Sequence, residues 1–412
     1  MRSSVQGIPS IPCDGPGLAA RTEARTALYV HVPFCAAPCP YCHFSKDRLS
    51  AAAVERWLSA LEREAAWRAP LADGVTFSSV FFGGGTPSAI SGRHFTRAWR
   101  AIREHFTLAP LAEITLEANP ETVKPTLLDA WAQAGVNRLS MGAQSFVPEE
   151  LAALGRLHDE RRPGAAFALA RAHGFRRLSV DLMFGFPGHT RARWARSLEA
   201  ALALEPEHVS AYGFIPEDGT PLGDAVRSGS VVPTPPELEA ELYLEADRAF
   251  AAHGLSPYET SNWCRAGGES RHNLSYWLRR DYLALGPSAH GLWRGVRYEN
   301  ARAWGDWAQR LERGEDPAVA EEGETPESRA DETVMLALRL ASGLDLRDVA
   351  PDQRDELARR YEAAFDAAVS AGRLERTPCG WRIPAAHRFV ADDTVAWLAV
   401  RARSLGAREV AA

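Results

Sequence analysis

The sequence predicts an α/β protein: a partial (β/α) TIM-like barrel followed by a small helical, winged-helix-like C-terminal domain. Three observations predict this fold class. β-like and helix-like segments alternate from residue 27 to about 262, as parallel βαβ units do. Glycines and polar residues follow every predicted strand, whereas a dinucleotide-binding sheet concentrates its glycines after the first strand. Beyond residue 331, helical segments precede a hairpin pattern.

Six short apolar or β-branched runs are the expected barrel strands. They are Ala27–Val32, Ser78–Phe82, Glu113–Leu116, Arg138–Met141, Leu178–Met183 and Val209–Phe214. The segments between them have the apolar spacing of amphipathic helices. These are Ala51–Trp67, Arg93–His105, Pro125–Ala134, Ala165–His173 and Arg191–Leu204. Because a barrel of this kind builds one site from the loops that follow its strands, those loops are expected to meet.

The chain divides by composition into five segments. They are a flexible N-terminal tail (1–25), the barrel core (26–262), an aromatic-rich extension (263–315), an acidic linker (316–330) and a C-terminal domain (331–400). In the last segment, Thr333–Leu340 and Arg354–Ala371 are expected helices and Arg373–Ile383 an expected hairpin.

Composition excludes several classes of protein. With 412 residues, 46% hydrophobic and 24% charged, the chain is globular rather than disordered. Its net charge of −6 gives no basic field for nucleic acid. No apolar stretch reaches the ~18 residues of a membrane span, and the first 25 residues have no signal-peptide core. Six cysteines are too few for a disulfide scaffold of this length, so a reducing cytoplasm is the expected location.

Three cysteines lie within eight residues, as Cys35-Ala-Ala-Pro-Cys39-Pro-Tyr-Cys42. Thiolates this close on a loop can converge on an iron–sulfur cluster or on a zinc ion. Zinc needs a fourth ligand, for which His31 or His43 is available. Three thiolates on a four-iron cluster instead leave one iron open to a small molecule with amino and carboxylate groups. Both alternatives remain open on the spacing alone.

Several motifs in a fixed order resemble the radical S-adenosylmethionine (SAM) superfamily, and more narrowly the oxygen-independent coproporphyrinogen III oxidase-like family. The resemblance covers roughly residues 27–395 and includes Tyr29-Val-His-Val-Pro-Phe-Cys35, Gly83-Gly-Gly-Thr-Pro87, Leu116-Glu-Ala-Asn-Pro120, Ser140-Met-Gly-Ala-Gln-Ser-Phe146, Leu154-Gly-Arg-Leu-His158 and Asp181-Leu-Met-Phe-Gly-Phe-Pro-Gly188.

This resemblance implies that Cys35, Cys39 and Cys42 hold a [4Fe-4S] cluster whose open iron binds SAM. It also implies a set of residues that contact SAM. They are Tyr29, Tyr41, Gly84, Gly85, Thr86, Glu117, Gln144, Arg156 and Asp181. The two glycines would let the backbone approach the methionine amino group, and the two tyrosines would flank adenine. For any one of the polar residues, the alternative is a solvated loop residue or a helix cap.

Two features resemble the branch of heme chaperones called HemW. The oxidase branch has a further cysteine two residues after the third, where this chain has His43-Phe44. His272-Asn273-Leu-Ser-Tyr276-Trp277 matches the HNxxYW motif of the chaperone branch.

The sequence around that motif is suited to a flat macrocycle. Five of the 12 tryptophans fall between residues 263 and 307, and aromatic faces stack on flat rings while imidazole ligates heme iron. His272, Asn273, Tyr276 and Trp277 are therefore the candidate heme residues, with His290 a weaker one. Nearby arginines could pair with heme propionates: Arg271, Arg279 and Arg280. The alternative is an aromatic core that seals the barrel, with His272 hydrogen-bonded inside it.

The leading hypothesis is a carrier that binds the cluster, SAM and heme and passes heme to apo-hemoproteins such as respiratory cytochromes. The alternative is an oxidase that takes electrons from a flavodoxin or ferredoxin, cleaves SAM and decarboxylates coproporphyrinogen III. The residues leave open whether SAM is cleaved, whether heme is bound covalently, the oligomeric state, and whether the protein associates with a membrane.

Overall fold

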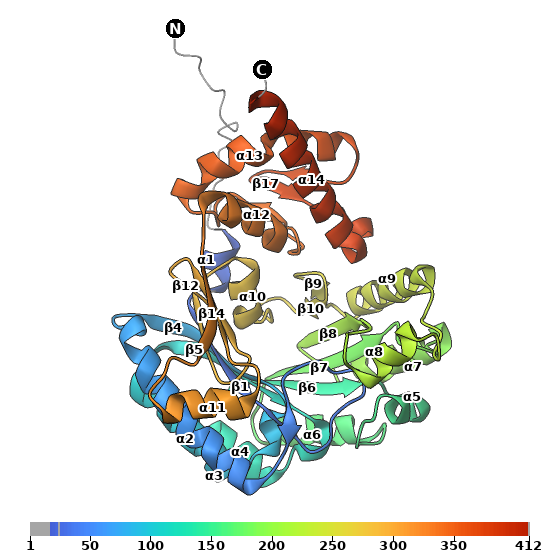
Figure 1. Ribbon diagram of the computed structural model, residues 1–412. Helices are drawn as coiled ribbons and strands as arrows, with labels where there is room; N and C mark the ends of the chain where they lie inside the picture. The colour runs from blue at the N-terminus through green and yellow to red at the C-terminus, as the bar shows by residue number, and fades with distance from the viewer. Residues whose placement is uncertain (1–16, 24, 411–412) are drawn as a thin grey trace.

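A partial barrel of parallel strands forms the centre of the molecule (Figure 1), seen in a computed structural model that describes residues 17–23 and 25–410. Its strands are neighbours in the order β1-β4-β5-β6-β7-β8 and pair in parallel throughout. They are β1 (Ala27–Val32), β4 (Thr76–Gly84), β5 (Thr107–Ala118), β6 (Arg138–Gln144), β7 (Arg177–Phe184) and β8 (His208–Gly213). The predicted fold class and all six predicted strands are confirmed.

Helices cover the outer face of this sheet (Figure 1). They are α2 (Ala51–Arg68), α3 (Gly92–His105), α4 (Pro125–Gln133), α5 (Pro148–Ala153), α6 (Arg162–Ala172), α7 (Arg191–Leu202), α8 (Pro221–Arg227) and α9 (Pro236–Ala252). Strand alternation explains the packing, because successive side chains point to opposite faces of a sheet. On β6, Leu139 and Met141 join the main hydrophobic core, whereas Ser140 faces inward and donates to Asp181. The inner face of the barrel therefore carries polar side chains alongside aromatic ones.

The aromatic-rich segment continues the same sheet. It contributes β9 (Ser256–Pro257), β10 (Asn262–Cys264), β11 (Tyr282–Leu285), β12 (His290–Trp293) and β13 (Val296–Asn300), with α10 (Arg271–Trp277) and α11 (Trp304–Glu312). Strand β11 pairs in parallel with β1, and β12 and β13 add antiparallel strands beyond it. Helix α10 packs against β4.

The segment 316–330, expected to be a linker, instead contains β14 (Ala318–Gly323), the edge strand paired with β13. Only its first residue is buried. An edge strand with one face and one side in solvent has the acidic, polar composition of a linker, which is why composition did not distinguish the two.

The C-terminal region has its own small core. The region consists of α12 (Pro326–Ala337), β15 (Leu344–Asp345), α13 (Pro351–Ser370), β16 (Glu375–Thr377), β17 (Gly380–Arg382) and α14 (Ala391–Val410). Phe365 stacks on Trp381 in this core, with ring centroids 4.3 Å apart. Both expected helices and the expected hairpin are present. Within the expected N-terminal tail, α1 (Leu18–Thr22) contacts α10, and residues 1–16 lie outside the described residues.

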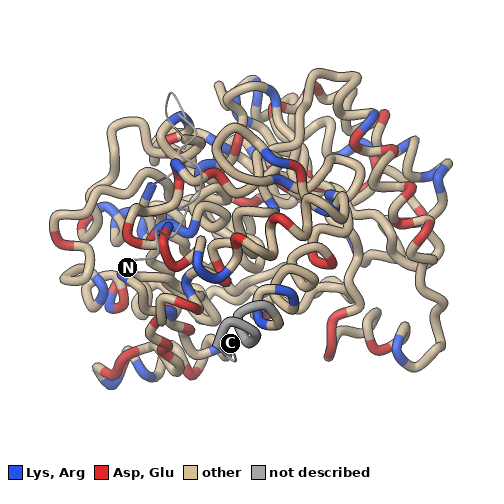
Figure 2. Tube along the Cα trace, turned by 90° about the horizontal axis from the view of Figure 1, so that it is seen from above, with Lys and Arg blue, Asp and Glu red and all other residues tan. Residues whose placement is uncertain are grey.

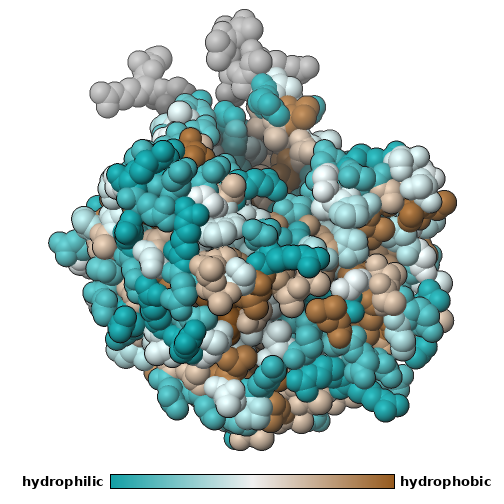
Figure 3. Space-filling view, turned by 60° about the horizontal axis from the view of Figure 1, so that its bottom comes forward, coloured by the Kyte–Doolittle hydropathy of each residue, from teal (hydrophilic) through white to brown (hydrophobic). Residues whose placement is uncertain are grey.

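Charged and hydrophobic residues are distributed over the surface of the described residues. Basic and acidic residues are interspersed along the trace in Figure 2. On the face brought forward in Figure 3, hydrophobic residues form separate patches among hydrophilic ones. In the part of the chain that the structure describes, no helix combines the length and apolar character needed to cross a membrane.

Candidate functional site

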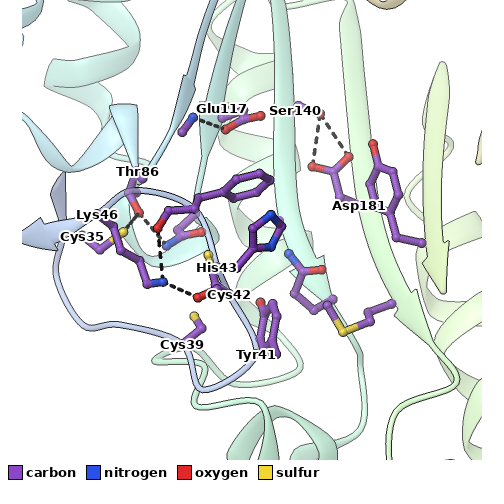
Figure 4. Close-up of a pocket in the computed structure, with 18 of the residues that line it drawn as sticks. Cys35, Cys39, Tyr41, Cys42, His43, Lys46, Thr86, Glu117, Ser140 and Asp181 are labelled. Atoms are coloured by element: carbon purple, nitrogen blue, oxygen red, sulfur yellow. Dashed lines mark hydrogen bonds between the residues drawn. The ribbon is translucent and has the colours of Figure 1, made fainter. Parts of the chain in front are cut away.

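A cavity of about 640 Å³ occupies the inside of the partial barrel. Its mouth is formed by the loop of Cys35, Cys39 and Cys42 (Figure 4), and its deep end by His272, Asn273 and Tyr276 of α10. The predicted site residues that line it are Tyr29, Cys35, Cys39, Tyr41, Cys42, Gly84, Gly85, Thr86, Glu117, Gln144, Arg156, Asp181, His272, Asn273 and Tyr276. The fold therefore brings together every predicted site residue except Trp277.

The cysteine loop leaves the C-terminal end of β1. The short strand β2 (Phe34–Cys35) pairs with β3 (Asp47–Arg48), and this pairing closes the loop at its base. Lys46 Nζ donates to the backbone carbonyl of Cys42 and so holds the loop folded on itself (Figure 4). All three thiols are free and half-buried. They are therefore accessible from the cavity without lying in open solvent.

Hydrogen-bond donors surround the sulfur atoms. Thr86 Oγ1 lies 3.4 Å from Cys35 Sγ, and Arg156 Nη1 lies 3.5 Å from Cys39 Sγ. Burial raises the pKa of the Cys35 thiol, and the Thr86 hydrogen bond opposes that rise. Donors and positive charge around free thiols stabilise the anionic thiolates that an iron–sulfur cluster requires. The residues present fit a [4Fe-4S] cluster.

The histidines considered as a fourth zinc ligand are engaged elsewhere. Nδ1 of His31 lies 3.1 Å from the Tyr29 hydroxyl, and its Nε2 lies 2.8 Å from the carbonyl oxygen of Ser45. Nδ1 of His43 lies 3.7 Å from a carboxylate oxygen of Glu217. With both nitrogens of His31 occupied and the His43 ring directed to Glu217, the loop favours the cluster over zinc.

The glycines after β4 bring backbone against the cysteine loop. Gly84 has a φ of +105°, a conformation that favours glycine. A Cβ on Gly85 would lie 2.8 Å from the Phe34 amide nitrogen and from the Val32 carbonyl oxygen. No side chain fits at either position, because a Cβ would overlap the His31 ring at Gly84 and the Val32 and Phe34 backbone at Gly85.

Two carboxyl groups face each other across the inside of the barrel. Glu117 accepts a hydrogen bond from the Gly84 amide at 3.2 Å. Asp181 accepts from Ser140 Oγ at 3.0 Å and from Ser179 Oγ at 3.2 Å. Burial, and then the charge of Asp181, raises the pKa of Glu117 to about 8. Glu117 therefore carries a proton at neutral pH and can donate as well as accept.

Gln144 reaches the cavity through an irregular backbone. The pairing of β6 with β7 shifts register between Gly142 and Gln144, and Gln144 has a φ of +67°. A non-glycine residue in this region is strained, and such strain clusters at ligand sites. Arg156 lies half-buried beside it and donates to Asn119 Oδ1 at 2.7 Å and to the Gly142 carbonyl at 2.8 Å.

The two predicted adenine-flanking tyrosines occupy different levels of the cavity. Tyr41 packs at the mouth in a small cluster with Leu154 and Phe214. Tyr29 lies deeper, on β1, with its ring 6.2 Å from that of Phe81. Burial raises the pKa of both hydroxyls, so both stay protonated.

His272 lies at the deep end with both ring nitrogens bonded. Its Nδ1 is 3.1 Å from Ser79 Oγ, and its Nε2 is 2.7 Å from the Tyr276 hydroxyl. The imidazole stacks on Phe81 at 5.0 Å. Burial lowers the His272 pKa to about 3, so the ring is neutral at physiological pH. Glu113 fixes the start of α10, because its carboxylate accepts from the His272 amide at 3.2 Å.

Trp277 points away from this cavity. It packs with a separate cluster that contains Tyr258, Leu278 and Leu340, and the Arg339 guanidinium lies 5.6 Å from its ring. For this residue the sequence motif marks a packing position on the outer side of α10. His290 is exposed on β12 and lies 3.8 Å from Glu299.

The three arginines expected to pair with propionates are engaged in protein contacts. Arg279 pairs with Glu324 and Glu332. The structure uses the other two in the same way: Arg271 donates to the carbonyl of Leu111, and Arg280 donates to the carbonyl of Asp348. They join α10 and the residues after it to neighbouring elements. Their proximity to the motif in the sequence could not distinguish this role from pairing with a ligand.

The cavity also has lining residues that motif reasoning missed. They are Phe81, Asn119, Arg138, Ser140, Met183, Tyr212, Phe214 and Glu217, among others. Strand alternation was the available signal, because Arg138, Ser140 and Gly142 occupy every second position of β6 and share one face.

Comparisons with known proteins identify the relatives of this chain. The radical SAM superfamily profile matches residues 29–201. A Mycobacterium tuberculosis protein named heme chaperone HemW is 37% identical over 84% of this chain and 89% of its own length. The Bacillus subtilis protein of that name is 35% identical over 77% of this chain and 84% of its own.

The fold is similar to a solved structure. Coproporphyrinogen III oxidase (HemN) from Escherichia coli superposes with a TM-score of 0.79 over 93% of both chains, at 22% identity. At that identity the likeness shows the fold alone. The identities and coverage of the sequence relatives show more: this chain belongs to the radical SAM superfamily, in the HemW branch of the oxygen-independent coproporphyrinogen III oxidase-like family.

Proposed function

We propose that this protein is a heme chaperone, which holds a [4Fe-4S] cluster and SAM at the mouth of the barrel cavity and heme at its deep end, and delivers heme to apo-hemoproteins. The observation that carries the proposal is the continuity of one cavity from the cysteine loop to His272. Relatives named heme chaperone HemW, similar over most of the chain, support the same function.

The mouth suits the cluster and SAM. When bound, these two groups supply one-electron chemistry, which belongs to the cofactors rather than to the side chains. Cys35, Cys39 and Cys42 would ligate the cluster, and Arg156 and Thr86 would stabilise its negative charge. Gly84 and Gly85 line the same space, where their backbone would face the SAM methionine. The remaining predicted SAM residues, among them Glu117, Gln144 and Asp181, line the same space.

The deep end suits a heme ligand. The imidazole of His272 is neutral, so no proton has to leave before a nitrogen can bind iron. Nε2 faces the Tyr276 hydroxyl at 2.7 Å, and ligation through this atom requires that bond to open. Tyr29 and Phe81 present flat aromatic faces next to the imidazole.

A hemin titration with two matched histidine variants tests the heme site. The titration is followed by the Soret band. The apparent affinity of His272→Ala for hemin is expected to fall about tenfold or more, because the axial ligand is lost. His208→Ala is the control. His208 is also buried in the barrel, but it bonds Ser179 and Tyr258 and is not among the described residues that line the cavity. An unchanged titration in His272→Ala would remove His272 from this role.

The same material distinguishes the chaperone from an oxidase. Where the oxidase branch has its further cysteine, Phe44 lies here with 57% of its surface exposed. Anaerobic incubation with coproporphyrinogen III and a flavodoxin or ferredoxin reductant is therefore expected to release no carbon dioxide. Steady release would overturn the chaperone proposal in favour of radical decarboxylation.

A further inference from the structure

One cationic side chain inside the barrel has no hydrogen-bond or ion-pair partner among the residues that the structure describes. Arg138, on β6, is only 2% exposed and lines the cavity. Among the described residues, none forms a hydrogen bond or an ion pair with its guanidinium. A buried charge without a partner is costly, and buried guanidinium groups are ordinarily paired. An anionic group that enters the cavity would supply the missing partner.

Arg138 lies toward the deep end. It is the first residue of β6 and pairs in register with Thr115 of β5 and with Arg177, the first residue of β7, so it lies away from the C-terminal ends of β6 and β7. Its charge lowers the pKa of His272 and that of Glu117, which places the guanidinium within electrostatic reach of both groups. The cysteine loop, by contrast, follows the C-terminal end of β1.

The carboxyl groups nearby do not neutralise Arg138. Asp181 is held by Ser140 and Ser179, and Glu117 accepts from Gly84, with neither at ion-pair distance from Arg138. At neutral pH Glu117 is protonated, since burial raises its pKa to about 8. The deep end therefore keeps a free positive charge toward any ligand that enters.

The other arginines near the proposed heme site are occupied. Arg279 pairs with Glu332, and Arg280 and Arg271 donate to backbone carbonyls. Arg156, at the mouth, donates to Asn119 and Gly142. Of the two arginines that line the cavity in the described part of the chain, Arg156 uses Nη1 and Nη2 at the mouth, whereas Arg138 makes no hydrogen bond or ion pair through its guanidinium.

We propose that Arg138 is the carboxylate anchor of the cavity and pairs with a propionate of the macrocycle bound beside His272. This inference rests on the proposed heme-binding function. A guanidinium presents two parallel N–H donors that match a carboxylate, so it fixes the rotation of the macrocycle as well as its depth. His272 then binds the iron while Arg138 selects a ligand that carries acid groups.

The test compares hemin with hemin dimethyl ester, in which both propionates are esterified. The full chain with its cluster reconstituted anaerobically is titrated with each compound. Wild type is expected to bind hemin about tenfold or more tightly than the ester. Arg138→Gln is expected to lose that preference and bind both compounds as wild type binds the ester. Arg138→Lys, which keeps the charge without the fork, is expected to retain part of the preference.

A second arginine serves as the control. Arg68 is also buried, but it bonds Asn300 at 3.2 Å and pairs with Asp316 at 3.5 Å, away from the described cavity-lining residues. Arg68→Gln is expected to keep the wild-type ratio of hemin to ester affinity. Should Arg138→Gln fail to fold, Arg138→Lys and the wild-type ratio still decide the matter.

The carboxylate of SAM is the other source of a matching anion. Equilibrium dialysis with SAM is expected to give the same affinity in wild type and Arg138→Gln. A loss of SAM affinity with an unchanged hemin-to-ester ratio would assign Arg138 to SAM and overturn the inference. A wild-type ratio in Arg138→Gln, or no preference in wild type, would overturn it while the His272 result still supports heme binding. If wild type binds neither compound, both proposals fail.

Discussion

The mouth and the deep end of the barrel cavity are built differently. At the mouth, three free and half-buried thiols lie on a loop that a short strand pair closes. At the deep end, His272 is 1% exposed, both of its nitrogens are bonded, and a buried carboxylate caps its helix. The thiols at the mouth are therefore available as ligands. At the deep end, by contrast, the His272 ring nitrogens already have partners within the chain, and Arg138 has none among the described residues.

This difference separates two kinds of function. A cluster needs free thiolates as ligands, and metal binding is coupled to the folding of the segment that supplies them. If His272 ligates heme iron, its hydrogen bond to Tyr276 must open, and that bond can form again when heme leaves. Heme held in this way would be released more easily than heme attached covalently. A carrier needs such an arrangement, because it has to release what it holds.

The largest expected effect is on the mouth. Cys35→Ala is expected to abolish iron and sulfide uptake, because two remaining thiolates cannot hold the cluster. Cys264→Ala is the control, since that cysteine is free but buried outside the cavity, and it should take up the wild-type amount. Iron and sulfide are counted after anaerobic reconstitution. Full uptake by Cys35→Ala would contradict the assignment.

The next effect tests the backbone at the mouth. Gly85→Ala is expected to lower the free energy of unfolding by about 1–3 kcal/mol, since the new Cβ would collide with backbone atoms that cannot move aside. Gly305→Ala is the matched control, because nothing lies within 4 Å of a Cβ at that position. Urea unfolding measures both. Equal stability of the two variants would mean that the loop after β4 is not tightly packed on the cysteine loop.

A third effect concerns the carboxyl group between the two ends. The pKa of Glu117 is about 8 in the folded chain against 4.5 in the unfolded one, so the folded state keeps a proton that the unfolded state loses. Stability should therefore fall as pH rises from about 4.5 to 8. Glu117→Gln removes this dependence and should gain on the order of 4 kcal/mol at pH 8, with no gain near pH 4.

Urea unfolding of both proteins at several pH values measures this gain. The comparison is between the two slopes, because other buried groups, such as Glu64, titrate in both proteins. Parallel slopes for wild type and Glu117→Gln would show that Glu117 is ionised in the folded state.

The smallest effect separates Trp277 from the rest of its motif. Trp277→Phe is expected to leave hemin affinity within about twofold of wild type, since the side chain packs with Tyr258 and Leu340 rather than in the cavity. A loss as large as that of His272→Ala would return Trp277 to the heme site. The hemin titration of the two variants side by side decides between these outcomes.

Sequence reasoning located the mouth better than the deep end. Spacing alone identified Cys35, Cys39 and Cys42, because a cluster constrains residues that are close in the chain. The glycine run after β4 was recognisable for the same local reason. Ser79 bonds His272 of α10 across the partial barrel, 193 residues away in sequence, and no local pattern marks such a contact. Arg138 is likewise more than 130 residues from His272 in the chain.

The arginines around α10 illustrate the same limit. Arg279 and Arg280 are adjacent to the motif, yet their partners Glu332 and Asp348 come from the C-terminal segment. Charge and proximity in sequence indicated a ligand contact, but which carboxylate an arginine meets depends on how distant elements pack. The strand β14 was missed because an exposed edge strand shares its composition with a linker.

The central claim is that one cavity holds a cluster at its mouth and heme at its deep end, each through its own residues. The most direct measurement reconstitutes wild type, Cys35→Ala and His272→Ala anaerobically, counts iron and sulfide, and then titrates hemin. We predict that Cys35→Ala loses the cluster but keeps the Soret band, whereas His272→Ala keeps the cluster and loses the band. Stoichiometric zinc in place of iron and sulfide, or a Soret band indifferent to His272, would contradict the account.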